Sequence, residues 1–315
     1  MDEKKKVHKT SIGGQALIEG VMMRGVDNCA MATRMPSGEI DVEMIPIKPS
    51  KEIPRIAKLP VVRGVVNFVS SLRLGYKCLM KSAEKAGLDD EEEGEPSKFE
   101  QKLEQWFGDK LMRVVSGVGM VLGLVLAIVL FMYLPSLAVK GLELLLPLGV
   151  FKAVVEGIIK IAVFVGYLAV VSRMGEIARV FEYHGAEHKT IACYEHGEAL
   201  TPENVKKYTR FHPRCGTSFI LIILVISILV FSFVTWSTLW VRILLKLALL
   251  PLVVGVGYEL IKVCGRYDNP VTRAVSKPGL WLQRLTTREP DEEQIAVAIA
   301  SLQAVLPKEG EDDRW

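Results

Sequence analysis

Four of the five histidines lie close together, within the 29 residues from His184 to His212 of this 315-residue chain. His184 and His188 are four residues apart, so a helix would place both imidazoles on one face, one turn apart. Apolar residues recur around them at spacings of three and four, which predicts such a helix. Two imidazoles in this arrangement can bind one divalent metal ion, and zinc is the ion that we expect.

Glu187 stands beside the second histidine and completes the pattern H-x-x-E-H. In the inverzincin pattern, two histidines hold zinc and the adjacent glutamate acts as general base on a water molecule. We therefore expect Glu187 to be the catalytic base of a hydrolytic site.

A zinc ion needs further protein ligands, three in total at a catalytic site and four at a closed structural site. His212 and Cys215 form an H-x-x-C spacing and are the candidates. The segment Thr201-Pro202-Glu203 predicts a short helix from 202 to about 210, which would return both residues to the first helix. Glu195 is another candidate third ligand, and Glu259 a more distant one.

Three other interpretations of this segment stay open. The first two histidines could be hydrogen-bonded to neighbouring glutamates with no metal. All four candidate ligands could close a structural zinc site, which leaves no position for water: His184, His188, His212 and Cys215. Three nearby cations could bind an anionic substrate group or lipid phosphates, or simply follow the excess of basic residues in cytoplasmic loops: Lys189, Arg210 and Arg214.

Long apolar runs predict an α-helical integral membrane protein. Apolar residues make up 50% of the chain and charged residues 24%, with a mean hydropathy of +0.28, so charge and apolar residues must be segregated along it. We expect about four transmembrane helices. They are the charge-free runs Val114–Leu134 and Gly216–Val241, and the runs Gly149–Ser172 and Ile243–Cys264, which contain a few charges.

The span predicted at 149–172 carries Lys152, Glu156 and Lys160, spaced by four residues. They share one helix face, where Glu156 can pair with either lysine. That face is expected to contact other protein or to reach outward. A transporter using these charges is the least favoured function, because four spans are few and no internal repeat is visible.

Basic residues predict the orientation in the membrane. They are concentrated in the segments 94–113, 173–215 and 262–288, which places both termini and the central loop in the cytoplasm.

Five scattered cysteines form no disulfide framework and indicate a reducing compartment. The charged first residues predict no secretory signal peptide. A net charge of +3 gives no reason to expect nucleic-acid binding.

Polar segments outside the spans predict a cytoplasmic unit with a small N-terminal β segment. The turn Pro36-Ser37-Gly38 separates two candidate strands, at 31–34 and 39–45. The glycine-punctuated segment Gly13–Gly25 is expected to be irregular and to lie near the histidines. Residues 60–82 predict an amphipathic helix with a basic side, either on the membrane surface or packed on the protein.

A further amphipathic helix is expected from Asp291 to Leu306. Together these features divide the chain into six predicted regions. The regions are a β unit (1–60), an amphipathic helix with an acidic linker (61–110), transmembrane helices 1 and 2 (111–172), the cytoplasmic loop with the candidate metal site (173–215), transmembrane helices 3 and 4 (216–264), and a cytoplasmic tail (265–315).

Several blocks of the sequence resemble the YqhQ-like family of bacterial membrane proteins. They are GGQALIEGVMMRG near the N-terminus, YHGAEHKTIACYEHGEALTPENV and HPRCGTSF in the centre, and PGLWLQRLTTREP near the C-terminus. The family is uncharacterised and is described as predicted metal-dependent enzymes. The resemblance implies a bacterial membrane protein and maps the metal-dependent activity onto His184, Glu187, His188, His212 and Cys215. It implies no substrate.

The sequence thus predicts a multi-pass protein of the bacterial inner membrane with both termini cytoplasmic. The leading hypothesis is a zinc-dependent hydrolase acting at the cytoplasmic membrane face. Its alternative is a non-enzymatic assembly or scaffold factor whose zinc is structural and whose basic surface binds a membrane protein partner. The expected partners are therefore the lipid bilayer and such a protein, with no nucleic acid.

Overall fold

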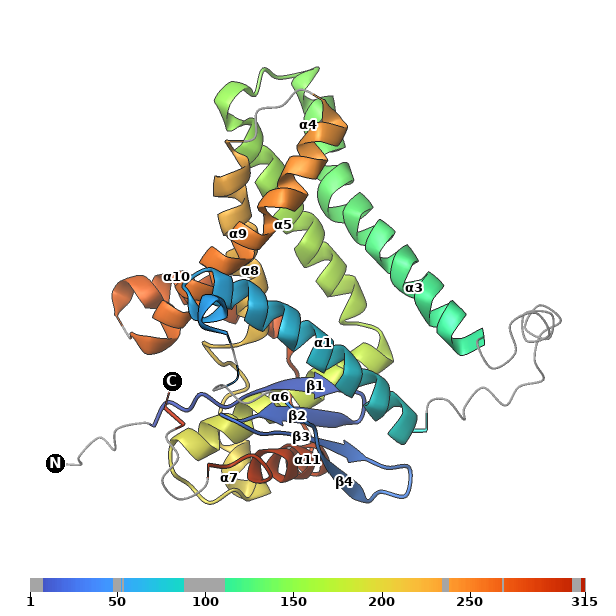
Figure 1. Cartoon of the computed structure of the whole chain (residues 1–315), viewed down its shortest axis with the longest axis vertical. Coiled ribbons are helices and arrows are strands. Elements are labelled where there is room, and N and C mark those ends of the chain that lie inside the picture. Colours follow the sequence, from blue (N-terminus) through green and yellow to red (C-terminus); the bar gives the residue numbers. More distant parts are fainter. Residues whose placement is uncertain are drawn as a thin grey trace. The chain divides into compact units, whose positions relative to one another are not determined.

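A computed structural model describes residues 8–47, 52, 54–87, 111–233, 238–267, 269–307 and 313–314 (Figure 1). The described residues form two compact units. The first lies within 1–87, 168–227 and 249–315, and the second within 88–167 and 228–248. The predicted acidic linker at 89–93 lies outside the described residues.

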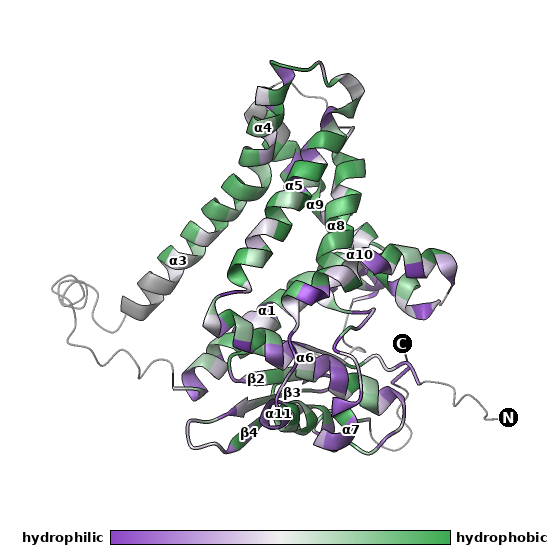
Figure 2. Ribbon diagram, turned by 180° about the vertical axis from the view of Figure 1, so that it is seen from behind, coloured by the Kyte–Doolittle hydropathy of each residue, from purple (hydrophilic) through white to green (hydrophobic). Residues whose placement is uncertain are grey.

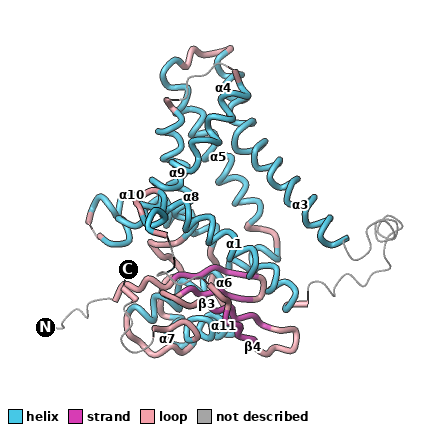
Figure 3. Tube along the Cα trace, in the orientation of Figure 1, coloured by secondary structure: helices cyan, strands magenta, loops and turns pink. Residues whose placement is uncertain are grey.

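The first unit is built on a four-stranded antiparallel sheet in the order β1-β2-β3-β4. Its strands are β1 (Gly13–Leu17), β2 (Gly20–Arg24), β3 (Cys29–Arg34) and β4 (Ile40–Met44). The predicted hairpin is confirmed, with Gly38 at φ 85° in the turn before β4. These strands are the only ones among the described residues, as Figure 3 shows.

The segment Gly13–Gly25 forms a regular hairpin, so the expectation of an irregular segment was wrong. Leu17 pairs with Gly20, which leaves Ile18 and Glu19 as a two-residue turn. Glu19, the second central residue of this turn, has φ 50°, a conformation that non-glycine residues adopt rarely. Its carboxylate accepts hydrogen bonds from Arg179 and, at 3.1 Å, from the Tyr183 hydroxyl, which hold the turn in place.

Helices cover both faces of the sheet and give the first unit three layers (Figure 1). Alternation along the strands supplies a separate core to each face. On one side Leu17, Met22 and Met31 pack with Cys78 of α1 (Val62–Lys85). On the other, Val21 and Met23 join residues from α6 (Gly175–Glu195) and α11 (Glu292–Gln303), including Tyr183, Ile295 and Leu302.

Two predicted helices of this unit are confirmed. α11 starts at a capping box in which the Asp291 carboxylate accepts from the Gln294 backbone and the Gln294 side chain accepts from the Asp291 backbone. α7 (Pro202–Lys206) begins after the predicted cap Thr201 and ends at Lys206 rather than near residue 210. A short 3-10 helix, η2 (Arg55–Lys58), precedes α1.

The helix of the histidines does not continue the preceding apolar helix. α5 (Lys152–Val171) ends before Ser172, and α6 begins at Gly175 after an extended Met174 with ψ 132°. The freed carbonyl of Ser172 accepts a hydrogen bond from Arg288 at 2.5 Å. Because this bond satisfies a backbone group, the break is stable and α6 can turn across the sheet.

Three helical stretches within the described residues are long and apolar enough to cross a membrane: Gly117–Glu143, Lys152–Val171 and Ile243–Arg266. The first combines α3 (Leu111–Ile128), a π-helical turn η4 (Val129–Tyr133) and α4 (Leu134–Glu143), and the 3-10 turn η5 (Gly149–Phe151) precedes α5. Figure 2 shows mainly hydrophobic colouring on α3, α5 and α8.

The remaining predicted span is shorter than expected. α8 (Gly216–Phe231) has 16 residues, and residues 234–237, inside the predicted run 216–241, lie outside the described residues. α9 (Leu239–Arg266) and α10 (Pro270–Thr286) follow. The count of four spans therefore stays a prediction.

The charged stripe of α5 pairs with other helices rather than with itself. Within the second unit, Glu156 accepts hydrogen bonds from Ser136 at 2.9 Å and from Lys246 of α9. Lys152 pairs with Glu143 at 2.6 Å, and Lys160 lies 5.5 Å from the centre of the Phe231 ring. Pairing with partners on other helices lets these charged groups lie between helices instead of facing apolar surroundings.

Leu302 tests the core between the sheet and α11, because its side chain is fully buried. We expect Leu302→Ala to lower the free energy of unfolding by about 2–5 kcal/mol, through lost burial and the cavity left behind. Thermal denaturation of the purified protein in detergent measures the change. Met44→Ala is the control, because Met44 is 53% exposed and its loss should change stability by only about 0.5 kcal/mol. Equal melting temperatures for the two variants would contradict this packing.

Candidate functional site

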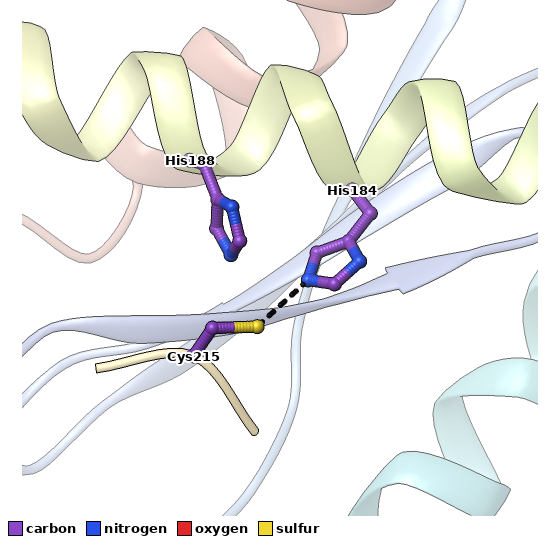
Figure 4. A group of neighbouring side chains, drawn as sticks. All are labelled: His184, His188 and Cys215. Atoms are coloured by element: carbon purple, nitrogen blue, oxygen red, sulfur yellow. Dashed lines mark hydrogen bonds between the residues drawn. The ribbon is translucent and has the colours of Figure 1, made fainter. Parts of the chain in front are cut away.

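Helix α6 presents His184 and His188 on one face, and Cys215 lies opposite them (Figure 4). His184 Nδ1 donates to the Thr286 carbonyl at 2.7 Å, and His188 Nδ1 donates to the Arg210 carbonyl at 2.6 Å. Within the described part of the chain, no backbone group bonds to either Nε2 atom. His184 Nε2 lies 3.2 Å from Cys215 Sγ. The centroids of the two imidazole rings are 4.4 Å apart.

Cys215 is placed to carry negative charge. It directly precedes α8, and its sulfur accepts from the Thr217 backbone N–H at 3.4 Å, so it faces the N-terminus of that helix. Burial alone would raise the pKa of the thiol, but His184 and His188 outweigh burial and hold that pKa well below its usual value. Correspondingly, burial would lower the pKa of His184, while the Cys215 thiolate raises it to about 9.

Glu187 is 5% exposed and lies beside the two histidines. The Gly14 backbone N–H donates to its carboxyl group, while Oε2 has no hydrogen-bond partner among the described residues. Burial raises the pKa of Glu187 against the opposing effect of His184 and His188. A buried carboxyl oxygen without a partner is costly unless something else binds it.

A glycine is required at position 14. A Cβ atom there would lie 2.7 Å from the Met22 carbonyl oxygen and 2.9 Å from Glu187 Cδ. The absence of a side chain therefore lets the edge strand β1 approach α6 closely enough to donate to Glu187. The expectation that the segment Gly13–Gly25 lies near the histidines is confirmed by this contact.

His212 lies close to the group, but its side chain faces other residues. Its ring is 5.5 Å from that of His188. His212 Nε2 lies 3.3 Å from Arg214 Nη2 and 3.9 Å from a Glu195 oxygen, and its backbone N–H donates to Gln283 at 2.8 Å. Burial lowers the pKa of His212. His212 would have to turn to become a fourth ligand.

The other acidic candidates have partners elsewhere. Glu195 accepts from the Thr10 backbone N–H at 2.8 Å and from Arg214. Glu259 accepts from the Arg63 side chain at 2.7 Å, which ties α9 to α1. Both carboxylates are therefore engaged in ion pairs.

The three cations near the histidines also pair with acidic side chains. Lys189 and Arg210 both contact Glu289, at 2.5 and 3.1 Å, and Arg214 pairs with Glu195. Neutralised in this way, they hold the segments around the histidines together. Binding of an anion would require these contacts to break.

A cleft of about 260 Å³ lies on the α1 side of the sheet. Its lining comes from β1, from β2 and from Ser71 and Leu74 of α1, and it includes the Arg24 side chain. Gly14 also lines it, so a single strand separates this cleft from Glu187.

The residues that the structure brings together fit a divalent metal. Ligand atoms of His184, His188 and Cys215 all lie within 4.8 Å of one another. Backbone carbonyls hold both Nδ1 atoms, the usual way in which proteins orient metal-binding imidazoles. The surroundings already favour the thiolate form that a metal requires. The unpartnered Glu187 oxygen supplies a further polar atom beside the donors.

Sequence reasoning missed the residues that orient this group. Thr286 and Gln283 act from α10, far along the chain, and no spacing rule connects them to the histidines. Their contribution is through a backbone carbonyl and a side-chain amide. The only early signal was the cluster of glycines around Gly14.

Comparison with known proteins identifies relatives of this chain without giving a function. Residues 59–308 match a family model described as "Protein of unknown function (DUF1385)". The chain is 35% identical over 295 residues to "Uncharacterized protein YqhQ" of Bacillus subtilis (strain 168), covering 93% of this chain and 92% of that protein. No solved structure matches the chain.

Gly14→Ala tests the close approach of β1 to Glu187. The added methyl group would overlap Met22, Met23 and Glu187, so we expect a loss of about 1–3 kcal/mol in stability. Gly13→Ala is the matched control, because a Cβ at Gly13 meets nothing within 4 Å. Thermal denaturation of both purified variants measures the difference. If both melt at the wild-type temperature, β1 does not approach α6 as described.

Proposed function

The chain belongs to the DUF1385 family, whose function is unknown. From the geometry of the site, we propose that it is a metal-dependent hydrolase. The observation that carries the proposal is the buried carboxyl group of Glu187, with one oxygen unpartnered, beside the close group of His184, His188 and Cys215. Three donors and a neighbouring carboxyl match the composition of catalytic zinc sites, which use three protein ligands.

The metal would be held by His184, His188 and Cys215, and zinc suits this mixture of imidazole and thiolate donors. When bound, it would supply Lewis acidity to a substrate carbonyl or phosphoryl group and favour ionisation of water. His212 is kept in the proposal as a ligand that could join by turning away from Arg214.

Glu187 would take and return the proton. Its raised pKa brings the carboxyl group nearer to neutral pH, where a general base is most effective. Gly14 holds one carboxyl oxygen, so the other is directed by that bond while the proton is transferred. Glu187 would first accept a proton from water and then donate it to the leaving group.

The proposed setting is the cytoplasmic face of the bacterial inner membrane. Three apolar helices suggest a membrane protein, and the basic segments between the predicted spans favour cytoplasmic termini. A substrate carried by the membrane, either a lipid-linked group or a peptide, would reach the site from the bilayer. A membrane protein partner is also compatible with this location.

A structural metal in a scaffold protein is the second candidate. Its supporting observation is the position of His212, whose ring is 5.5 Å from that of His188. Four protein ligands would leave no open position for water. In that case the metal would only join α6 to the loop before α8.

Metal content tests both versions of the site. We expect purified wild-type protein to contain about one equivalent of zinc by elemental analysis, and His184→Ala with His188→Ala to contain none. His196→Ala is the control, because His196 is exposed at the end of α6, where its ring donates to the Ala192 carbonyl and lies beside Tyr208. A folded wild type that binds no zinc, even after incubation with zinc, would contradict the proposal and leave an unmetallated thiolate–imidazolium pair.

Glu187→Gln separates catalysis from metal binding. The variant should keep its zinc, while hydrolysis should fall about 10²- to 10⁴-fold because an amide cannot accept the proton. Fluorogenic esters, peptides and phosphodiesters, tested with protein in vesicles, provide the assay. Glu182→Gln is the matched control on the same helix, since Glu182 binds Gln294 away from the histidines. Equal activity in Glu187→Gln and wild type would rule out the assigned role and favour the scaffold.

A further inference from the structure

Helix α1 of the first unit has apolar side chains on two faces, of which the sheet covers one. Leu74 and Leu79, both half-buried, pack on the sheet beside Cys78. The buried positions of α1 are small or weakly polar: Gly64, Gly75, Cys78 and Ser82. Large apolar side chains recur at spacings of three and four on the opposite face, and all of them are exposed: Val62, Val66, Val69, Leu72, Tyr76 and Met80. Leu72 is 57% exposed. A helix that packs on protein alone normally buries its apolar face.

Helix α10 also leaves large apolar side chains exposed. Its buried face is mainly polar and satisfied inside the protein, as where Gln283 donates to the His212 carbonyl and to Ser218. Its exposed face carries Val271, Ala274 and Trp281, the last 54% exposed. Two helices of one compact unit that both expose an apolar face indicate a shared apolar environment.

The charges on these helices indicate what that environment is. α1 and α10 together contain eight basic residues and one acidic residue, whereas the whole chain has 39 and 36. Arg73 and Lys77 are exposed on α1, as are Lys277 and Arg284 on α10. Apolar side chains flanked by cations are typical of helices that lie on an anionic lipid surface.

Contacts with α9 fix the position of α1 along that helix. Gly64 packs so closely that a Cβ there would lie 2.7 Å from Tyr258 and 3.0 Å from Gly255 of α9. Tyr258 is eight residues before Arg266, where this candidate span ends, or about 12 Å along the helix. α10 begins only four residues after Arg266. Both helices therefore adjoin the same end of a membrane-spanning segment.

We propose that α1 and α10 lie in the interfacial layer of an anionic lipid bilayer, with their exposed apolar faces in contact with lipid. The partner is the lipid surface itself. Exposed cations on the two helices contact the headgroups, and the sheet stays on the aqueous side. This inference goes beyond the proposed hydrolase and does not depend on it.

The arrangement has a consequence for the candidate site. The Thr286 carbonyl that holds His184 belongs to the last turn of α10, and Ser71 and Leu74 of α1 line the cleft beside Gly14. A site held by an interfacial helix is suited to a substrate that arrives in the bilayer.

Spin labels measure the proposed contact directly. Single cysteines are introduced at Leu72, Tyr76, Ala274 and Trp281, and the full chain is reconstituted in vesicles of phosphatidylcholine with phosphatidylglycerol. All five native cysteines are buried, and the unsubstituted protein measures their background labelling. Met44→Cys is the matched control, because Met44 is an exposed apolar residue that belongs to β4 and to neither helix. Collision with oxygen reports lipid, and collision with a water-soluble nickel chelate reports water.

We expect the oxygen-to-nickel collision ratio at the α1 and α10 labels to exceed that at Met44 several-fold. A ratio equal to that at Met44 would place these faces in water and overturn the proposal. Low collision with both reagents would mean that a protein or a second copy covers them, which also overturns it. Replacing phosphatidylglycerol with phosphatidylcholine should shift the labels towards water, and no shift would overturn the anionic preference. Labelled variants are compared only if they melt at the wild-type temperature.

Discussion

Two hydrogen bonds from imidazole Nδ1 atoms to backbone carbonyls determine the candidate site. They connect α6 to the end of α10 at Thr286 and to the loop before α8 at Arg210. With both Nδ1 atoms engaged, the Nε2 atoms are directed at Cys215, whose sulfur faces the start of α8. Since the bonds use main-chain oxygens, the site depends on how these segments pack.

Burial and neighbouring charges together set the protonation of the groups at the site. Glu187 has lost its contact with water, and Gly14 satisfies only one of its oxygens. Opposite charges compensate the nearby buried groups, as where Arg214 pairs with Glu195 and Lys189 with Glu289. Most charged residues around the histidines are therefore used in holding the fold together. The carboxyl group of Glu187 is not used in this way, so it is available for proton transfer.

The first unit is assembled from both ends of the chain. The N-terminal sheet packs against α6 from the centre and against α11 from the C-terminal region. Asp313 accepts hydrogen bonds from Thr10 at 2.6 Å and from Tyr194 at 3.0 Å, so it closes the unit on one side. The large exposed apolar side chains of α1 and α10 lie outside its core.

Local patterns predicted a large part of the elements. Helical spacing located α1, α6 and α11, capping residues located α7, and the turn before β4 located one hairpin. Such signals arise from the backbone and from one face of an element, so they can be read in short windows. The hairpin at Gly13–Gly25 and the break before α6 were not predicted. Both depend on distant partners, Arg179 for Glu19 and Arg288 for Ser172.

The sequence by itself determined the residue types of the candidate site and the presence of apolar segments, because composition and spacing are local properties. Only the tertiary structure decided that Cys215 faces the two histidines of α6 while His212 faces Arg214. Only it placed Gly14 against Glu187 and left the apolar face of α1 exposed. Contacts between residues far apart in the chain follow from the packing of whole elements, and the spacing of residues along one segment does not specify them.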